Sequence, residues 1–279
     1  MSVKRNRHNI KGLLNNLFGL IVALISIFPL IWMAIASFKP ENEVLGFPFR
    51  LLPTRWVPDN YIQLFANRDI PFLSSIKATL IVSIIATVLS LIIATMAAYA
   101  FARLDFKFKK SMWAIVITTM YIPGIATMIP AFILMARMNL LNTYAVLILP
   151  SLAYAYNILF FRQFFLSMPV SIEEAALIDG ASRFQIFHKI FLPMSTSPMV
   201  IVGVSIFVGY WNSFVWPSIT VSDPSLYQVT QIIQSYNATY AQKYGVVMAG
   251  STLVAVIPIA LFLIFQRYIV KGITLTGLK

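Results

Sequence analysis

Six long apolar runs constrain the fold of this chain more than any other feature of its sequence. A membrane-spanning helix needs about 20 mostly apolar residues. Runs of roughly that length or more occupy residues 17–37, 73–100, 111–136, 144–165, 196–220 and 246–268. We therefore predict an all-α integral membrane protein, with six transmembrane helices in a single domain over residues 1–279. Pro123, Gly124 and Pro130 fall inside the third run, so we expect that span to be bent or broken.

The composition supports the membrane assignment. Hydrophobic residues make up 59% of the 279 residues and charged residues only 11%, and the mean hydropathy is +0.82. A soluble globular protein carries roughly 25% charged residues. This chain has too few charged side chains to cover its own surface in water.

The sequence lacks the residues that common catalytic sites require. It contains no cysteine, and its two histidines, His8 and His188, lie far apart. This excludes a disulfide framework and a cysteine nucleophile and argues against a metal cluster. The sequence also contains no phosphate-binding G-x-x-x-x-G-K-[ST] motif, no H-E-x-x-H and no G-x-S-x-G. We expect no catalytic residue, no metal and no cofactor on this chain, and no enzymatic activity of its own.

The net charge of +12 indicates membrane topology. With both termini placed inside, 14 Lys and Arg and 4 Asp and Glu lie inside, giving +10, against 7 and 5 outside, giving +2. The positive-inside rule favours this orientation, so we expect cytoplasmic termini and no nucleic-acid binding. The first run also resembles a cleaved signal peptide at Ala34-Ile35-Ala36, but it exceeds the 7–15 residues of a signal h-region. We favour a retained anchor.

The apolar runs are essentially free of acids, which argues against proton coupling and more weakly against sodium coupling. Such spans suit a neutral solute. Aromatic and amide side chains in the fourth and fifth runs are our candidates for the solute pathway, although Tyr and Trp also gather at membrane interfaces. These candidates are Tyr154, Tyr156, Asn157, Tyr210, Trp211 and Asn212.

Two outer loops have some length, at about 38–72 and 221–245. The first contains five prolines together with Trp56 and Tyr61. It is either a surface for an external partner or a plain loop with interfacial aromatic residues.

The segment at about 168–195 is the least hydrophobic internal loop, and its pattern predicts two short helices. Ser171 and Glu174 form a capping-box pattern, and Asp179-Gly180 provides a helix stop. Ser182 and Gln185 repeat the capping box. Pro193 leads into the fifth run. An apolar stripe at helical spacing follows the second box, formed by Phe184, Phe187, Ile190 and Phe191. This stripe is covered either by the protein's own spans and lipid or by a groove on a cytoplasmic partner.

This loop resembles the EAA loop of binding-protein-dependent ABC importer permeases. The matching residues are Glu174-Ala175-Ala176, Asp179-Gly180-Ala181 and Ile190-Phe191-Leu192-Pro193. Further marks resemble the MalG-like carbohydrate-uptake permeases: Ser37-Phe38-Lys39-Pro40, Asn60-Tyr61, Tyr210-Trp211-Asn212 and the run from Gln266 to Gly272. One departure is Ser75-Ile76-Lys77, where this family leads us to expect an Asn-Ser pair.

The resemblance implies a type I ABC importer permease fold. It also implies that the loop is a coupling helix seated in a groove of an ATP-hydrolysing subunit. The coupling residues would be Glu173, Glu174, Ala175, Ala176, Asp179, Gly180, Phe184, Phe187 and Pro193.

The resemblance further implies a complex in a prokaryotic inner membrane. Its members would be this chain, a second, MalF-like permease, two ABC ATPases that bind ATP and magnesium, and an external solute-binding protein that delivers a sugar or oligosaccharide. A self-sufficient secondary transporter and a non-transporting membrane scaffold are the competing interpretations.

Overall fold

The computed structural model describes the backbone of residues 2–67, 71–239 and 243–276, and the side chains of residues 15–67, 71–236 and 243–269. The described residues form helices and connecting loops, with no strand among them. Their contacts divide the chain into two compact units. One unit is Met1–Phe72 with Ile233–Val256, and the other is Leu73–Ile232 with Ile257–Lys279.

The first unit contains α1 (Ser2–Ala36), α2 (Glu41–Val44) and α3 (Asp59–Ala66), with parts of α14 (Val229–Thr239) and α15 (Tyr244–Thr276). The Glu41 carboxylate accepts hydrogen bonds from the backbone N–H groups of Tyr244 and Gly245, at 2.5 and 3.0 Å. These amides open α15, where a negative charge is favourable. Asn60 Nδ2 donates to the carbonyls of Ser37 and Lys39, both at 2.9 Å. The first outer loop is therefore tied to the start of α15 by specific polar contacts.

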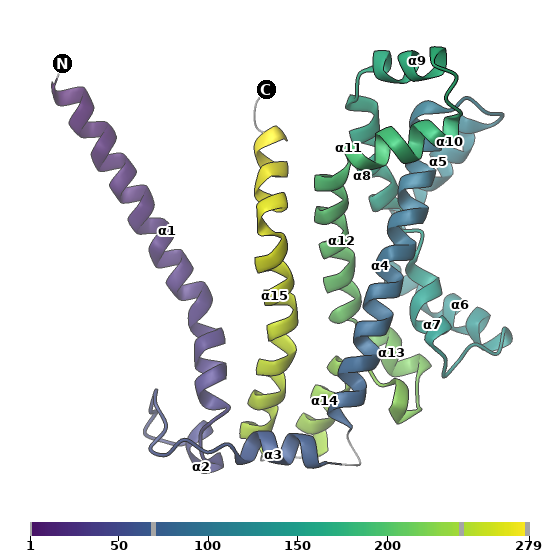
Figure 1. Ribbon diagram of the computed structural model, residues 1–279. Coiled ribbons are helices and arrows are strands. Elements are labelled where there is room, and N and C mark those ends of the chain that lie inside the picture. Colours follow the sequence, from purple (N-terminus) through teal and green to yellow (C-terminus); the bar gives the residue numbers. More distant parts are fainter. Residues whose placement is uncertain (1, 68–70, 240–242, 277–279) are drawn as a thin grey trace. The chain divides into compact units, whose positions relative to one another are not determined.

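Three helices are long and apolar enough to cross a membrane without interruption. Their apolar parts are Asn15–Ala36 in α1, Phe72–Arg103, which is all of α4, and Tyr244–Ile269 in α15. They coincide with the first, second and sixth apolar runs (Figure 1). The other three runs are all interrupted.

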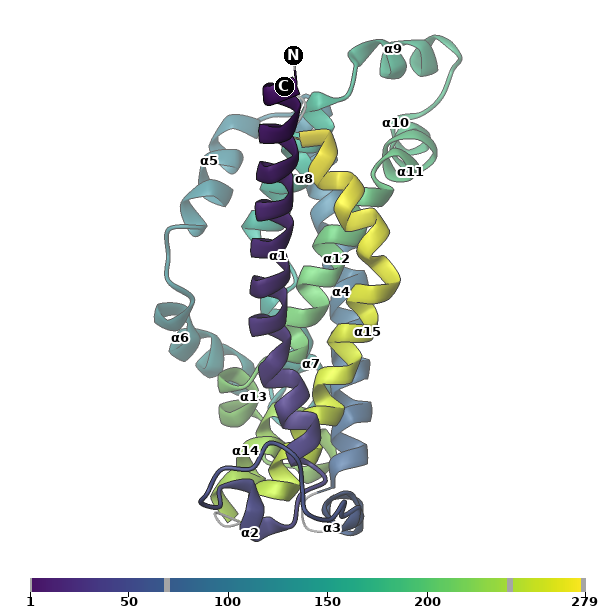
Figure 2. The same cartoon turned by 90° about the vertical axis from the view of Figure 1, so that its left-hand side faces the viewer.

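The third run is broken at the predicted place. α5 (Lys109–Thr119) and α6 (Gly124–Arg137) meet at 104° across a short connection, and Figure 2 shows the extended chain between them. Pro123 is the residue before α6, with φ −59° and ψ 131°. Because proline has no N–H to continue a helix, the break falls here.

The fourth run consists of α7 (Tyr144–Ile148), the 3₁₀ turn η1 (Leu149–Ser151) and α8 (Ala155–Ser167), with a bend of 48°. Pro150 cannot donate to the carbonyl of Val146, and Trp216 Nε1 donates to that carbonyl instead, at 2.7 Å. The Ile148 carbonyl accepts from the Tyr210 hydroxyl at 3.1 Å. Side chains of the fifth run thus satisfy carbonyls next to the bend in the fourth.

The fifth run, expected at 196–220, is not one helix. α12 (Thr196–Trp211) ends before α13 (Val215–Thr220), which is followed by the 3₁₀ turn η3 (Pro224–Leu226). A continuous helix would set the ring of Pro217 against the carbonyl of Ser213, four residues earlier. In the observed structure Pro217 lies in the first turn of a new helix, where proline is tolerated.

Between the fourth and fifth runs lie α9 (Val170–Ile178), α10 (Arg183–Ile186), the π-turn η2 (Phe187–Phe191) and α11 (Leu192–Met194). They lie at one end of the second unit, beside the end of α4 (Figure 1). The core of this end is a cluster of buried side chains from α4, α8, the α10–η2 segment and α12, including Tyr99, Phe161, Phe165, Phe187 and Phe191.

Candidate functional site

The segment 168–195 folds into two short helical pieces joined by a tight turn, as its pattern predicts. α9 carries Glu173, Glu174, Ala175 and Ala176. The turn carries Asp179 and Gly180, and the second piece carries Phe184, Phe187 and Pro193. The candidate coupling residues predicted from the sequence therefore all lie on one compact helix pair.

The predicted capping box at the start of α9 is wrong. α9 begins at Val170, and Pro169 occupies the N-cap position with φ −57° and ψ 132°. Ser171 consequently lies inside the first turn, and no side chain caps this end. The fixed φ of proline is already suitable for entering a helix, so the helix starts one residue before the serine.

The turn after α9 is a Schellman motif. Gly180 has φ +79°, and its N–H donates to the Leu177 carbonyl at 3.0 Å, while the N–H of Ala181 donates to the Ala176 carbonyl at 2.9 Å. A residue with a Cβ pays about 1–2 kcal/mol in this left-handed conformation. The predicted helix stop at Asp179-Gly180 is confirmed, and backbone geometry explains the glycine.

The second capping box is also confirmed. The Gln185 N–H donates to Ser182 Oγ at 3.2 Å, and the Ser182 N–H donates to Gln185 Oε1 at 2.8 Å. The helix that follows widens into the π-turn η2, which ends two residues before Pro193. Pro193 offers no N–H to the carbonyl of Lys189 and crowds it, and a π-turn accommodates such a mismatch.

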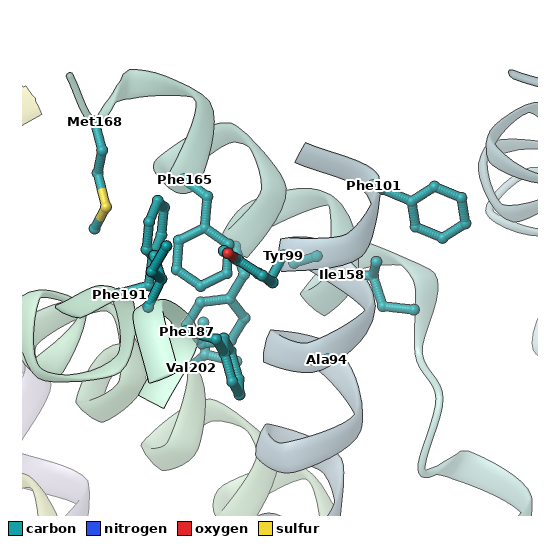
Figure 3. Packing of buried hydrophobic residues seen from close by; sticks show 12 residues of the cluster. Ala94, Tyr99, Phe101, Ile158, Phe165, Met168, Phe187, Phe191 and Val202 are labelled. Carbon is teal, nitrogen blue, oxygen red and sulfur yellow. The ribbon is translucent and has the colours of Figure 1, made fainter. Parts of the chain in front are cut away.

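The apolar stripe of the second piece is divided between inside and outside. Phe187 and Phe191 are buried, with ring centroids 5.2 and 5.0 Å from that of Tyr99 on α4. Phe165 of α8 joins them, 5.4 Å from Phe191. Figure 3 shows these four rings gathered on one side of α4, with Phe101 pointing away. The protein's own helices therefore cover this half of the stripe.

Of the stripe, Phe184 alone is exposed, since Ile190 is partly buried against the same cluster. Apolar side chains of α9 are exposed as well. Phe184 is 68% exposed and Ile178, the last residue of α9, is 86% exposed. Val170 and Leu177 of α9 are exposed as well. We call Val170, Leu177, Ile178 and Phe184 the outer apolar set. Apolar side chains held on rigid turns and left in the open are typical of a surface that binds another protein.

The residue that anchors this substructure, Arg103, was not among the site residues predicted from the sequence. Glu173 is only 5% exposed, and its Oε2 lies 3.7 Å from Nη1 of Arg103, whose side chain is 6% exposed. The other oxygen, Oε1, accepts a hydrogen bond from Nη1 of Arg183. A buried carboxylate is tolerated when it is paired and hydrogen-bonded in this way.

Arg103 also binds the end of α8. Its Nη2 donates to the carbonyls of Phe165 and Met168, at 2.5 and 2.6 Å, and its guanidinium lies 5.2 Å from the ring centroid of Phe191. One side chain at the end of α4 therefore contacts α8, α9 and η2. The available signal was a lone arginine closing an apolar run, which is otherwise typical of an interface anchor.

The candidate pathway residues lie in different environments. Tyr154 and Tyr156 are exposed, whereas Asn157 is buried. The hydroxyl of Tyr210 is engaged with the Ile148 carbonyl. Trp211 is buried and stacks on Phe207, with centroids 5.9 Å apart, and Asn212 is exposed at the end of α12. The structure does not bring these six residues together in one place.

Comparison with known proteins identifies the family. Residues 90–275 match the model of the binding-protein-dependent transport system inner membrane component. The chain belongs to this family. It is an inner membrane transport permease, and its relatives are transport proteins rather than enzymes.

Two relatives and one solved structure show how far the likeness extends. The chain is 31% identical to the arabinooligosaccharides transport system permease protein AraQ of Halalkalibacterium halodurans, over 92% of this chain and 93% of that protein. It is 31% identical to the lactose transport system permease protein LacG of Rhizobium radiobacter, over 90% and 91%. A chain of a bacterial ABC transporter that imports alginate shares the fold, with a TM-score of 0.81 at 23% identity over 94% and 97%.

Proposed function

We propose that this chain is one of two permease subunits of an ABC importer for a sugar or oligosaccharide. Its 31% identical relatives are named for arabino-oligosaccharide and lactose transport. The nearly acid-free spans fit a neutral solute and argue against proton coupling. Transport energy then comes from ATP, bound with magnesium by two partner ATPases.

We propose that segment 168–195 faces the cytoplasm and seats in a groove on one of these ATPases. The outer apolar set is the observation that carries this proposal, because its four side chains are exposed on a helix pair that is otherwise firmly held. The Schellman turn and the second capping box fix the backbone, and the Glu173 carboxylate joins it to α4. A rigid projection of this kind can transmit a displacement of the ATPase to the spans.

The remaining partners follow from the same proposal. A second, MalF-like permease completes the pathway, and lipid covers the apolar faces that remain. An external solute-binding protein delivers the sugar to the side that carries the first outer loop. Both termini of the chain lie in the cytoplasm of a prokaryotic cell, as the distribution of Lys and Arg predicts.

The decisive experiment compares two bulky substitutions in the purified complex. Gly180→Trp places an indole on the exposed turn, where a Cβ meets open space but the φ of +79° strains any side chain. We expect loss of uptake from a chain that remains inserted. Lys107→Trp adds the same bulk to an exposed residue outside the helix pair and should transport normally. Normal uptake by Gly180→Trp would contradict the coupling role.

Co-purification tests the assembly itself. The tagged chain, extracted in mild detergent from its native membrane, should bring down a P-loop ATPase and a second EAA-containing permease. Recovery of the folded chain alone, with gradient-driven uptake in liposomes, would overturn the proposal in favour of a secondary transporter.

A further inference from the structure

The second unit contains a hollow at the place where its three interrupted spans break. The hollow has a volume of about 740 Å³, within the range of about 300–1,000 Å³ that small-molecule sites occupy. Its lining comes from the end of α5 and start of α6, from the connection between η1 and α8, and from the connection between α12 and α13. Figure 2 shows the first of these breaks, between α5 and α6.

The lining is uncharged. Among the described residues around the hollow there is no Asp, Glu, Lys, Arg or His. A charged solute would lose part of its hydration against this wall with no opposite charge to offset the loss, a penalty that grows with burial. A neutral solute carries no such penalty.

Aromatic rings form part of the wall. Tyr154 is 63% exposed and Phe214 40% exposed, and both line the hollow. The ring of Trp216, also in the lining, is held by its hydrogen bond to the Val146 carbonyl. Tyr and Trp each combine an apolar face with a polar end, which suits a sugar ring with its C–H faces and peripheral hydroxyls.

Hydroxyl groups on the wall are oriented as acceptors. Thr119 Oγ1 donates to the Val116 carbonyl at 2.7 Å, and Thr127 Oγ1 donates to the Gly124 carbonyl at 3.0 Å. A hydroxyl has one proton and two lone pairs, so each threonine, having donated its proton to its own helix, can accept a hydrogen bond from a solute hydroxyl. Ser213 lines the third break.

We propose that this hollow is a saccharide site of the permease, selective for uncharged sugars, in which Tyr154 and Phe214 contact ring faces and the two threonines accept from sugar hydroxyls. This inference rests on the proposed function of sugar import. It adds the place in the permease where the uncharged solute makes contact and the residues that contact it. The hollow is lined by residues at the breaks of all three interrupted spans.

Because the sequence contains no cysteine, an introduced cysteine is the single thiol of this chain that a reagent can modify. Ile125→Cys, at an exposed position on the wall of the hollow, is placed in the complete transporter with its binding protein in proteoliposomes. It is treated with a water-soluble methanethiosulfonate reagent during ATP turnover. We expect modification, slowed at least fivefold by lactose or arabinotriose, whichever the unmodified transporter imports, and unaffected by trigalacturonate. Ile92→Cys is the control. It lies outside the hollow on the exposed apolar face of α4, where we expect lipid to cover it, so a water-soluble reagent should not modify it.

Each other result overturns the inference. An unreactive Ile125→Cys in a transporter that imports normally means that the second permease or lipid fills the hollow. A reactive thiol that no imported sugar protects, or that trigalacturonate protects equally, excludes a selective saccharide site. Absence of any saccharide uptake by the unmodified transporter instead overturns the proposed function, and this is measured first.

A pair of tyrosines provides the second readout. Tyr154 lines the hollow, whereas Tyr156, nearly as exposed, does not. Tyr154→Ala should raise the KM for sugar uptake up to about tenfold, Tyr154→Phe much less, and Tyr156→Ala should leave KM unchanged. Equal effects of the two alanine variants would contradict a ring contact at Tyr154.

Discussion

The carboxylate of Glu173 lies between two arginines that belong to different elements of the fold. Its Oε2 is 3.7 Å from Nη1 of Arg103, the last residue of α4, and its Oε1 accepts from Nη1 of Arg183, the first residue of α10. One buried acid therefore joins a membrane span to both halves of the helix pair. If a partner displaces α9, as we propose, this ion pair provides a direct connection from α9 to α4.

Two neighbouring glutamates allow this role to be tested. Glu173→Gln removes the charge that faces the buried Arg103, and breaking a buried pair costs about 3–5 kcal/mol. We expect a lower melting temperature of the purified complex and faster hydrogen exchange over residues 168–195. Glu174→Gln changes the next residue, which is exposed, and should leave both measurements unchanged.

Co-purification of the ATPase with the Glu173→Gln and Glu174→Gln variants distinguishes a structural role from a contact with the partner. If Glu174 touches the ATPase, Glu174→Gln lowers ATPase co-purification while the melting temperature stays constant. Identical melting temperatures for Glu173→Gln and the unmodified protein would show that the ion pair does not hold the helix pair.

Gly180 is predicted to matter through its backbone conformation. Gly180→Val forces a β-branched residue into φ +79°, which should destabilise the turn by about 1–2 kcal/mol. Gly180→Asn should cost less, since asparagine adopts the left-handed region more readily. Hydrogen exchange of the Ala181 amide, which donates to Ala176, reports the turn directly. Equal exchange in the two variants would contradict a conformational role.

Substitution by alanine should affect different properties at Phe184 and Phe187: binding of the ATPase at Phe184 and stability of the fold at Phe187. Phe187→Ala empties a position in the core around Tyr99, and such a change costs about 3–5 kcal/mol. Phe184→Ala removes an exposed side chain, so stability should change by no more than about 0.5 kcal/mol. Phe184→Ala should instead weaken binding of the ATPase, measured by co-purification. A Phe184→Ala complex of unchanged affinity would remove this residue from the docking surface.

The sequence predicted the helical membrane fold and the helix pair because both depend on local patterns. The membrane spans follow from the length of each apolar run. The turn at Gly180 and the capping box of Ser182 and Gln185 depend on residues that are neighbours in the sequence. The sequence did not show which phenylalanines of the stripe are buried and which are exposed. Their burial depends on Tyr99 and Phe165, which are distant in sequence.

The same limit explains the remaining differences. Ser171 matched the capping pattern, but the adjacent Pro169 determined where α9 begins. Arg103 closes an apolar run, and only the folded chain shows that it contacts Glu173 and two carbonyls of α8. Pro217 divides the fifth run, although the apolar composition on either side reads as continuous.

Tyr210 is expected to stabilise the bend in the fourth span through its hydroxyl. That hydroxyl donates to the Ile148 carbonyl at 3.1 Å, next to the 3₁₀ turn that contains Pro150. Tyr210→Phe leaves the carbonyl without this donor and should cost about 0.5–1.5 kcal/mol, seen as a lower melting temperature of the complex. Tyr227→Phe is the matched control, because its hydroxyl bonds to the Ser222 carbonyl in an exposed position where water can replace it. An unchanged melting temperature for Tyr210→Phe, with sugar uptake impaired, would instead place this hydroxyl in the solute pathway.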